Sequence, residues 1–367
     1  MKYWNLFRQN FVTVRNKQLM GYRYIGSKTR IADEIIEYIS ETMTLSDSAY
    51  FIDAFSGTGC VAEKAALHGW PVYINDMMKS AVVMSEARLL AASDAQFSEF
   101  GGYSAVIDIL NNLPGREGFI WREYSPASSI YHENERKYFT EENAKKIDAI
   151  TEQIHIWKNR GRISEKECTL LLSDLIRAVN DVANIAGTYG CFLSQWTAQA
   201  NDMLHLSVSS LKNEPVVFKA TNADVFQVDS DEQDIVYFDP PYTKRQYASY
   251  YHILETIVCG DQPEVSGVSG LRPWKDKASV FCYKTKALKA LTQLIIQQRA
   301  KRVVLSYSNE GHVQLDDLTA ALKPYGEVKV IELKTIGRYR PNKTAVDNKA
   351  EVNEYLVDFW RKQEINE

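Results

Sequence analysis

Short apolar runs that alternate with helix-forming stretches open this chain. Residues 50–55 and 71–76 are such runs, and residues 60–67 and 77–90 have helical character. Apolar runs of this length, bounded by Gly, Pro or Asn, are typical of buried strands. The order strand, helix, strand, helix therefore predicts the start of a parallel, doubly wound α/β sheet.

The same pattern returns in the second half of the chain. It predicts strands at 234–238, 302–306, 328–333 and 354–359, with helices at about 284–299 and 314–323. Between these two parts the chain indicates helices and loops without clear strands. There Thr140 precedes one helix, and Ser164 with Glu167 forms a capping box that begins another.

These patterns predict a sheet domain that is interrupted by a helical insertion. We expect residues 1–94 and 216–367 to form the catalytic domain, and residues 95–215 to form a separate helical domain. Insertions of this size between two strands usually carry a function of their own.

The composition indicates a soluble globular protein, with 45% hydrophobic and 25% charged residues. No apolar run is long enough to span a membrane, and the first residues lack the apolar core of a signal peptide. Five scattered cysteines without Cys-x-x-Cys spacing predict reduced core residues of a cytoplasmic protein. No His or Cys pair has metal-ligand spacing, so we expect no metal site.

Charge is unevenly distributed, although the net charge is only −4. Residues 240–290 contain eight Lys or Arg against four acids, and a second basic stretch lies between 334 and 349. Basic segments of this kind are expected to contact phosphates. Ordinary solvated loops would show the same charge pattern.

The tetrapeptide Asp239-Pro240-Pro241-Tyr242 directly follows the apolar run at 234–238. Two prolines cannot continue a strand ladder because they lack amide donors, so the chain must leave the sheet in a stiff, extended form. Asp239 and a proline carbonyl could then accept hydrogen bonds from an exocyclic amine, while Tyr242 stacks on the ring that carries the amine. A strand that simply ends in a turn is the alternative.

A glycine loop follows the first predicted strand. Gly57 and Gly59 precede a helix, and Asp76 ends the next strand 19 residues after Gly57. This spacing is typical of a nucleotide-binding loop in which the later acid binds a ribose hydroxyl. Asp53 would repel a pyrophosphate and would favour a sulfonium or ammonium, which indicates S-adenosylmethionine. A nicotinamide or flavin dinucleotide, or a turn without a ligand, are the alternatives.

Several motifs, in this order, resemble those of one enzyme family. The segments 55–59, 75–76 and 239–242 are similar to the cofactor and catalytic motifs of Dam-like, amino-directed adenine DNA methyltransferases. The segment 23–28 resembles their N-terminal cofactor motif, although Tyr24-Ile-Gly-Ser stands where Trp-Ala-Gly-Gly is more common. Further segments resemble the FokI-type branch of restriction-modification enzymes, namely 245–252, 305–310, 338–343 and 353–356.

The resemblance implies a Rossmann-like S-adenosylmethionine-dependent methyltransferase sheet with a helical target-recognition insertion. The catalytic residues that it implies are Asp239, Pro240, Pro241 and Tyr242. The implied cofactor-binding residues are Tyr24, Lys28, Asp53, Phe55, Gly57, Gly59, Asp76 and Asp224, with a surface turn as the alternative for Asp224. The basic residues expected to contact DNA are Lys244, Arg245, Arg272, Lys275, Arg338, Arg340 and Lys343.

The implied activity is site-specific methylation of the adenine N6 amine in duplex DNA, as the modification part of a restriction-modification system. Its partners would be double-stranded DNA and a cognate restriction endonuclease, with no membrane and no obligate protein partner. Asp239 and the Pro240 carbonyl would orient the amine of a flipped-out base for direct transfer of a methyl group. Amino methylation of RNA adenine or DNA cytosine, an NAD-dependent oxidoreductase and a silent DNA-binding module are the alternatives.

Overall fold

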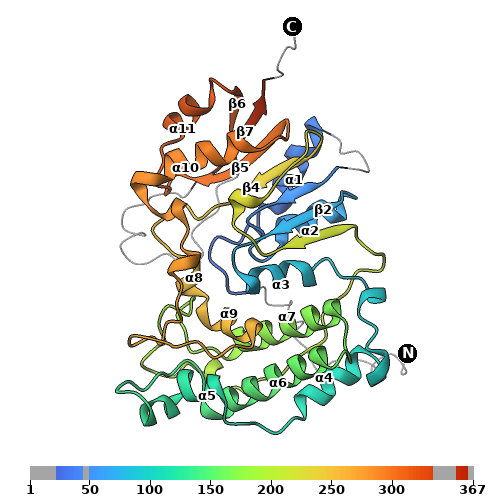
Figure 1. The fold of residues 1–367 in the computed structure, drawn as a ribbon, viewed down its shortest axis with the longest axis vertical. Helices are drawn as coiled ribbons and strands as arrows, with labels where there is room; N and C mark the ends of the chain where they lie inside the picture. Colours follow the sequence, from blue (N-terminus) through green and yellow to red (C-terminus); the bar gives the residue numbers. More distant parts are fainter. Residues whose placement is uncertain (1–21, 44–48, 334–352, 363–367) are drawn as a thin grey trace, which may run out of the picture.

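A single twisted sheet forms the upper part of the molecule (Figure 1). A computed structural model describes residues 22–43, 49–333 and 353–362. The sheet has the strand order β3-β2-β1-β4-β5-β7-β6. Its strands are β1 (Phe51–Asp53), β2 (Val72–Asn75), β3 (Phe218–Thr221), β4 (Ile235–Phe238), β5 (Arg302–Ser308), β6 (Gly326–Glu332) and β7 (Glu354–Arg361). Within this order β7 is antiparallel to both of its neighbours, and the other paired strands are parallel.

Alternate residues of the central strands enter two different cores. Phe51, Ile235 and Val304 pack with helices α1 (Ala32–Thr42) and α2 (Cys60–Leu67) on one face of the sheet. Their chain neighbours enter the core on the other face, beneath α10 (Lys284–Gln297) and α11 (Leu315–Leu322). This alternation is the two-residue period of a strand that is buried on both sides, and it explains why the strands appear as continuous apolar runs.

The predicted strands are confirmed at β1, β2, β4, β5, β6 and β7. The antiparallel direction of β7 was not predicted, and neither were β3 and α1. β3 lies at the edge of the sheet and its residues are half-buried or exposed, so it lacks the apolar run by which a central strand is recognised.

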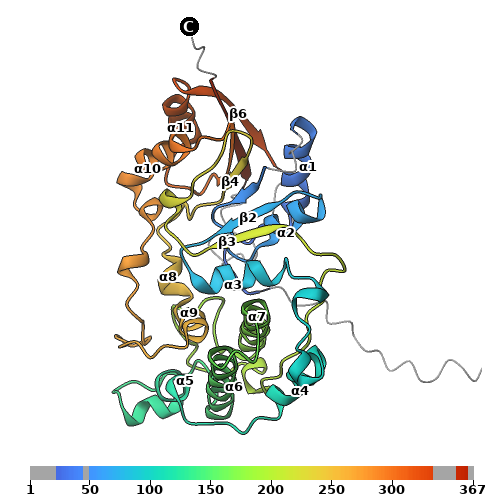
Figure 2. The ribbon, with the colours of Figure 1, turned by 45° about the vertical axis from the view of Figure 1, so that its right-hand side comes forward.

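A layer of helices lies below the sheet in Figures 1 and 2. Its elements include α4 (Tyr103–Asn111), α5 (Phe119–Tyr124), α6 (Glu141–Asn159) and α7 (Glu165–Val182). As predicted, α6 begins after a Thr140 cap and α7 begins with the Ser164 capping box. Two helices from the sheet part, α3 (Lys79–Ala87) and α9 (His252–Cys259), pack against α7 and share its apolar core. The helical layer therefore packs on the sheet part through a continuous apolar core. The predicted domain boundaries at residues 95 and 215 stay a prediction.

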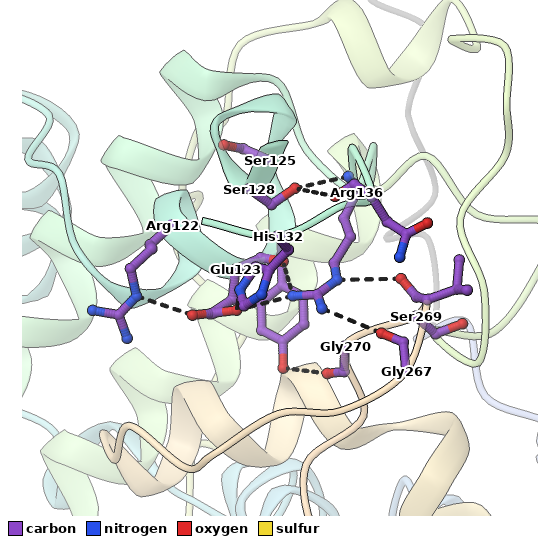
Figure 3. Close-up of polar contacts among 12 residues, drawn as sticks. Arg122, Glu123, Ser125, Ser128, His132, Arg136, Gly267, Ser269 and Gly270 are labelled. Carbon is purple, nitrogen blue, oxygen red and sulfur yellow. Dashed lines mark hydrogen bonds and ion pairs between the residues drawn. The ribbon is translucent and has the colours of Figure 1, made fainter. Parts of the chain in front are cut away.

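The hairpin after α9 is held firmly against the helical layer. The sequence of residues 266–272 predicts a mobile loop, but Ser266 and Leu271 exchange two backbone hydrogen bonds of 2.9 and 2.8 Å. Arg136, which is 2% exposed, donates to the carbonyls of Gly267 and Val268 from the helical layer (Figure 3). Buried donors thus bind the backbone of this turn, and its mobility stays a prediction.

Among the described residues, no helix is both long and apolar enough to cross a membrane. Within the same ranges, no group of three or more His, Cys, Asp or Glu side chains is placed to hold a metal ion.

Candidate active site

The acids predicted from the sequence meet at one edge of the sheet. Asp53 ends β1, Asp76 follows β2 and Asp239 follows β4. Because these strands are parallel neighbours, their carboxyl ends lie side by side. A single cavity opens at this edge and is lined by all three acids together with Tyr24, Gly57 and Pro241. Pro241 and the glycine loop thus border the same space.

The glycine loop brings the backbone close to its neighbours. Gly57 and Gly59 have φ values of 52° and 76°, in the left-handed region that favours glycine. A Cβ atom on Gly59 would lie 2.5 Å from the Cα of Ser85 on α3, so any larger residue would displace that helix. Position 59 therefore requires glycine for two reasons, the positive φ value and the close approach of α3.

Asp76 is bound to the glycine loop through backbone amides. Its Oδ2 accepts from the Gly57 amide at 3.0 Å, and its Oδ1 accepts from the Met78 amide at 2.9 Å. Burial raises the pKa of Asp76 to about 6, although both hydrogen bonds lower it. The carboxylate is thus fixed at the cavity wall and retains lone pairs for a hydroxyl donor.

Asp53 is buried in the cavity wall with unused hydrogen-bonding capacity. It is 2% exposed, and its Oδ1 has no hydrogen-bond partner among the described residues. Burial raises its pKa to about 8, and the nearby Asp239 and Asp76 carboxylates add to this effect. A buried acid of this kind is stabilised by a cation, so the donor set fits the sulfonium or ammonium of S-adenosylmethionine.

Aromatic rings form two further walls. Tyr24 stacks on Tyr251 with ring centroids 4.3 Å apart, and the Tyr251 hydroxyl accepts from the Ile25 amide at 2.6 Å. On the other side, Phe55 contacts Phe281 edge to face at 5.7 Å. The predicted residues Tyr24 and Phe55 therefore both line the cavity.

Asp224 lies in a surface turn that borders the cavity, and its cofactor-binding role stays a prediction. It caps a short 3-10 helix (Val225–Gln227) by accepting from the Phe226 amide at 3.0 Å, and it is exposed. It also lines the cavity beside Phe226.

Asp239 is paired with a residue from the N-terminal motif. The Lys28 Nζ atom lies 2.9 Å from its Oδ1, and Lys28 is 4% exposed. Burial raises the pKa of Asp239, while Lys28 opposes that rise. Lys28 lines the cavity, as predicted, and its charged end contacts Asp239.

Glu354 lies at the same edge, within the segment 353–356 that resembles the FokI-type branch, and its role was not predicted. The Tyr242 hydroxyl donates to its Oε1 at 3.3 Å, and its Oε2 lies 3.6 Å from Lys28 Nζ. Glu354 begins β7 and pairs with Ser308 at the end of β5. An antiparallel strand places its first residue at the edge where parallel strands end. Only the strand direction, which was not predicted, could have revealed this residue.

The predicted DNA-binding residues have different environments. Lys244 and Arg245 are exposed directly after Tyr242, and Lys275 is exposed at the rim of the same edge. Arg272 is already bound to Asp261 by two hydrogen bonds of 3.1 and 2.8 Å and to Thr256 at 3.0 Å. Arg338, Arg340 and Lys343 lie outside the described residues.

Comparison with known proteins identifies similar chains. The family model of the D12 class N6 adenine-specific DNA methyltransferase matches residues 24–320. The chain is 36% identical to the type II methyltransferase M.FokI of Planomicrobium okeanokoites and 34% identical to the modification methylase StsI of Streptococcus sanguinis. These matches cover 94% and 93% of this chain but only 53% and 52% of those relatives. The type II methyltransferase M.NlaIII of Neisseria lactamica is 32% identical, over 88% of this chain and 93% of its own length. The chain thus spans about half the length of the first two relatives and nearly all of the third.

Proposed function

The chain belongs to the D12 class N6 adenine-specific DNA methyltransferase family, and on that premise we propose that it methylates the N6 amine of adenine in duplex DNA. The observation that carries this proposal is the shared cavity. The acid and the stiff Pro-Pro exit that suit an amine border the same space as the glycine loop, Asp53 and Asp76.

Methyltransferases of this family generally use S-adenosylmethionine, which supplies an electrophilic methyl group on a sulfonium. We assign its ribose to Asp76 and its cationic end to Asp53, because each acid lines the cavity with hydrogen-bonding capacity to spare. Tyr24, Phe55 and Asp224 would complete the pocket.

Asp239 would accept a hydrogen bond from one amine proton, and the Pro240 carbonyl would accept the other. These bonds orient the nitrogen lone pair and stabilise the positive charge that develops on nitrogen. Tyr242 would stack on the flipped base and recover part of the unstacking energy. The chain's contribution is mainly position and electrostatics.

We assign phosphate contacts to Lys244, Arg245 and Lys275, because all three are exposed at the rim of this edge. Base reading is assigned to the helical layer of residues 95–215. The relatives include proteins described as type II and modification methylases, which supports a role as the modification part of a restriction-modification system with a separate endonuclease.

The direct test is identification of the modified nucleoside. The protein would be incubated with labelled S-adenosylmethionine and unmethylated bacterial DNA, and the digested nucleosides separated by mass. We expect N6-methyl-2′-deoxyadenosine from DNA and no label in RNA from the same cells. Label in N4-methyl-2′-deoxycytidine, or in RNA alone, would replace the proposed substrate with one of the alternatives.

A further inference from the structure

Three buried charges lie at the catalytic end of the sheet, and one of the acids is incompletely bonded. Lys28 lies between Asp239, at 2.9 Å, and Glu354, at 3.6 Å. The longer distance exceeds a hydrogen bond. Among the described residues, Glu354 Oε2 is buried without a hydrogen-bond partner. Lys28 can therefore pair closely with either acid: with Asp239, as in this structure, or with Glu354.

The proposed chemistry places two groups on one carboxylate. Asp239 must accept a hydrogen bond from the incoming amine while the Lys28 ammonium is paired with its Oδ1. A cation at that carboxylate also weakens it as an acceptor when positive charge develops on the amine nitrogen. The ammonium would therefore compete with the amine for Asp239.

We propose that Glu354 is a positioning residue that takes Lys28 from Asp239 when the target base enters. This inference rests on the proposed function. A shift of roughly 1 Å brings the ammonium to the usual charge-assisted distance from Glu354 Oε2. That move completes the hydrogen bonding of Oε2 and releases Asp239 for the amine. In the free protein, the same lysine opposes the rise in the pKa of Asp239 that burial causes.

Tyr242 couples this exchange to base binding. Its hydroxyl donates to Glu354 Oε1 at 3.3 Å, and Lys28 Nζ lies 5.5 Å from the centre of its ring. Tyr242, whose ring would stack on the base, thus lies next to both the Lys28 ammonium and Glu354, the second acceptor for that ammonium. The other groups that face these charges are Asp53, Tyr237 and Tyr247, from β1, β4 and α8 (Tyr247–Tyr250).

A double-mutant cycle tests the exchange. Single-turnover transfer of labelled methyl groups to unmethylated bacterial DNA would be measured for the wild type, Glu354→Gln, Lys28→Met and the double variant. We expect Glu354→Gln to slow transfer about 30-fold, because Lys28 then stays on Asp239. With Lys28→Met there is no ammonium to remove, so adding Glu354→Gln should slow transfer by no more than about threefold.

Further measurements separate exchange from a merely structural role. Lys28→Met should move the acid limb of the rate profile to higher pH, because Lys28 lowers the pKa of Asp239. Glu354→Gln should leave the calorimetric affinity for S-adenosylmethionine within about threefold of the wild type. Glu327→Gln, in an exposed pair with Lys329 on the same sheet, is the control for loss of one acid.

Each outcome decides a different question. Additive losses in the cycle, with an active wild type, would overturn the exchange and leave the proposed function standing. A wild type that transfers no methyl group to DNA would overturn both. Glu354→Asp keeps the charge and should lose less activity than Glu354→Gln, and equal losses would overturn the exchange. Should the glutamine variant not fold, the cycle is run with Glu354→Ala, which also removes the carboxylate.

Discussion

Buried acids occur both in the helical layer and at the edge of the sheet, but their hydrogen bonding differs. In the helical layer, Asp148 accepts from the amides of Ile120 and Trp121 at 2.9 and 2.8 Å. Glu123 binds Arg122, His132 and Arg136 with its two oxygens (Figure 3). At the sheet edge, Asp53 Oδ1 and Glu354 Oε2 have no hydrogen-bond partner within the described parts of the chain.

The difference indicates what each region does. A buried charge that has all its hydrogen bonds stabilises one structure, because any change leaves a partner unpaired. A buried acid with a free lone pair is unfavourable in the free protein and gains from a ligand. Asp148 and Glu123 therefore stabilise the framework of the helical layer, whereas Asp53 and Glu354 retain acceptor capacity at the edge where we propose that cofactor and base bind.

The largest effect is expected from Asp239→Ala. Methyl transfer should fall by about 10³-fold or more, because the amine loses its acceptor. The fold should remain, since Lys28 can pair with Glu354 instead. Labelled methyl incorporation and a thermal melt would measure the two effects, with Glu327→Gln as the control. Transfer at the wild-type rate would remove Asp239 from the catalytic role.

Because Arg136 belongs to the hydrogen-bonded helical layer, Arg136→Met should lower the stability of the fold strongly rather than affect methyl transfer directly. Removing this buried guanidinium leaves two hairpin carbonyls without their donor and breaks two hydrogen bonds to Glu123, which should cost about 3 kcal/mol of unfolding free energy. Urea denaturation would measure it. Arg122→Met is the matched control: Arg122 binds the same acid, but its side chain is 38% exposed, so it should cost less than about 1 kcal/mol. Equal costs would contradict the assignment of Arg136 to the framework.

Asp53→Asn should separate stability from cofactor binding. Burial raises the pKa of Asp53 from its ordinary value of 3.8, which applies to the unfolded chain, to about 8 in the folded protein. Between these two pH values the folded protein therefore binds more protons than the unfolded chain. Stability should therefore decline as pH rises from about 4 to about 8, and the variant should decline less. Urea denaturation across this range would measure the difference.

The same variant should bind S-adenosylmethionine about tenfold more weakly at pH 8, since the cation loses an ionised partner. Calorimetry would measure this affinity, with Asp229→Asn, an exposed acid, as the control. An unchanged affinity would show that Asp53 does not face the cationic end of the ligand.

The smallest effect is expected from Lys244→Gln combined with Arg245→Gln. These exposed residues would contact phosphates, so DNA binding should weaken only a few-fold at physiological salt. The slope of log affinity against log salt should become shallower by about 2. Fluorescence anisotropy over a range of salt concentrations would measure the slope. An unchanged slope would place the DNA elsewhere on the molecule.

Local sequence patterns determined much of this protein. The apolar runs located six strands, Ser164 and Thr140 marked two helix starts, and the Asp-Pro-Pro-Tyr and glycine motifs identified the acids of the cavity. Each of these signals depends on neighbours a few residues apart, which is the range over which propensity and periodicity act.

The tertiary structure alone decided which distant side chains meet. Lys28, from a segment before the first strand, reached Asp239, and the reversed direction of β7 brought Glu354 to the same edge. Arg136 reached the carbonyls of Gly267 and Val268 in a hairpin more than 130 residues further along the chain. These contacts span more than 80 residues, and they follow from strand order and direction, which packing of the whole chain decides and no local pattern encodes.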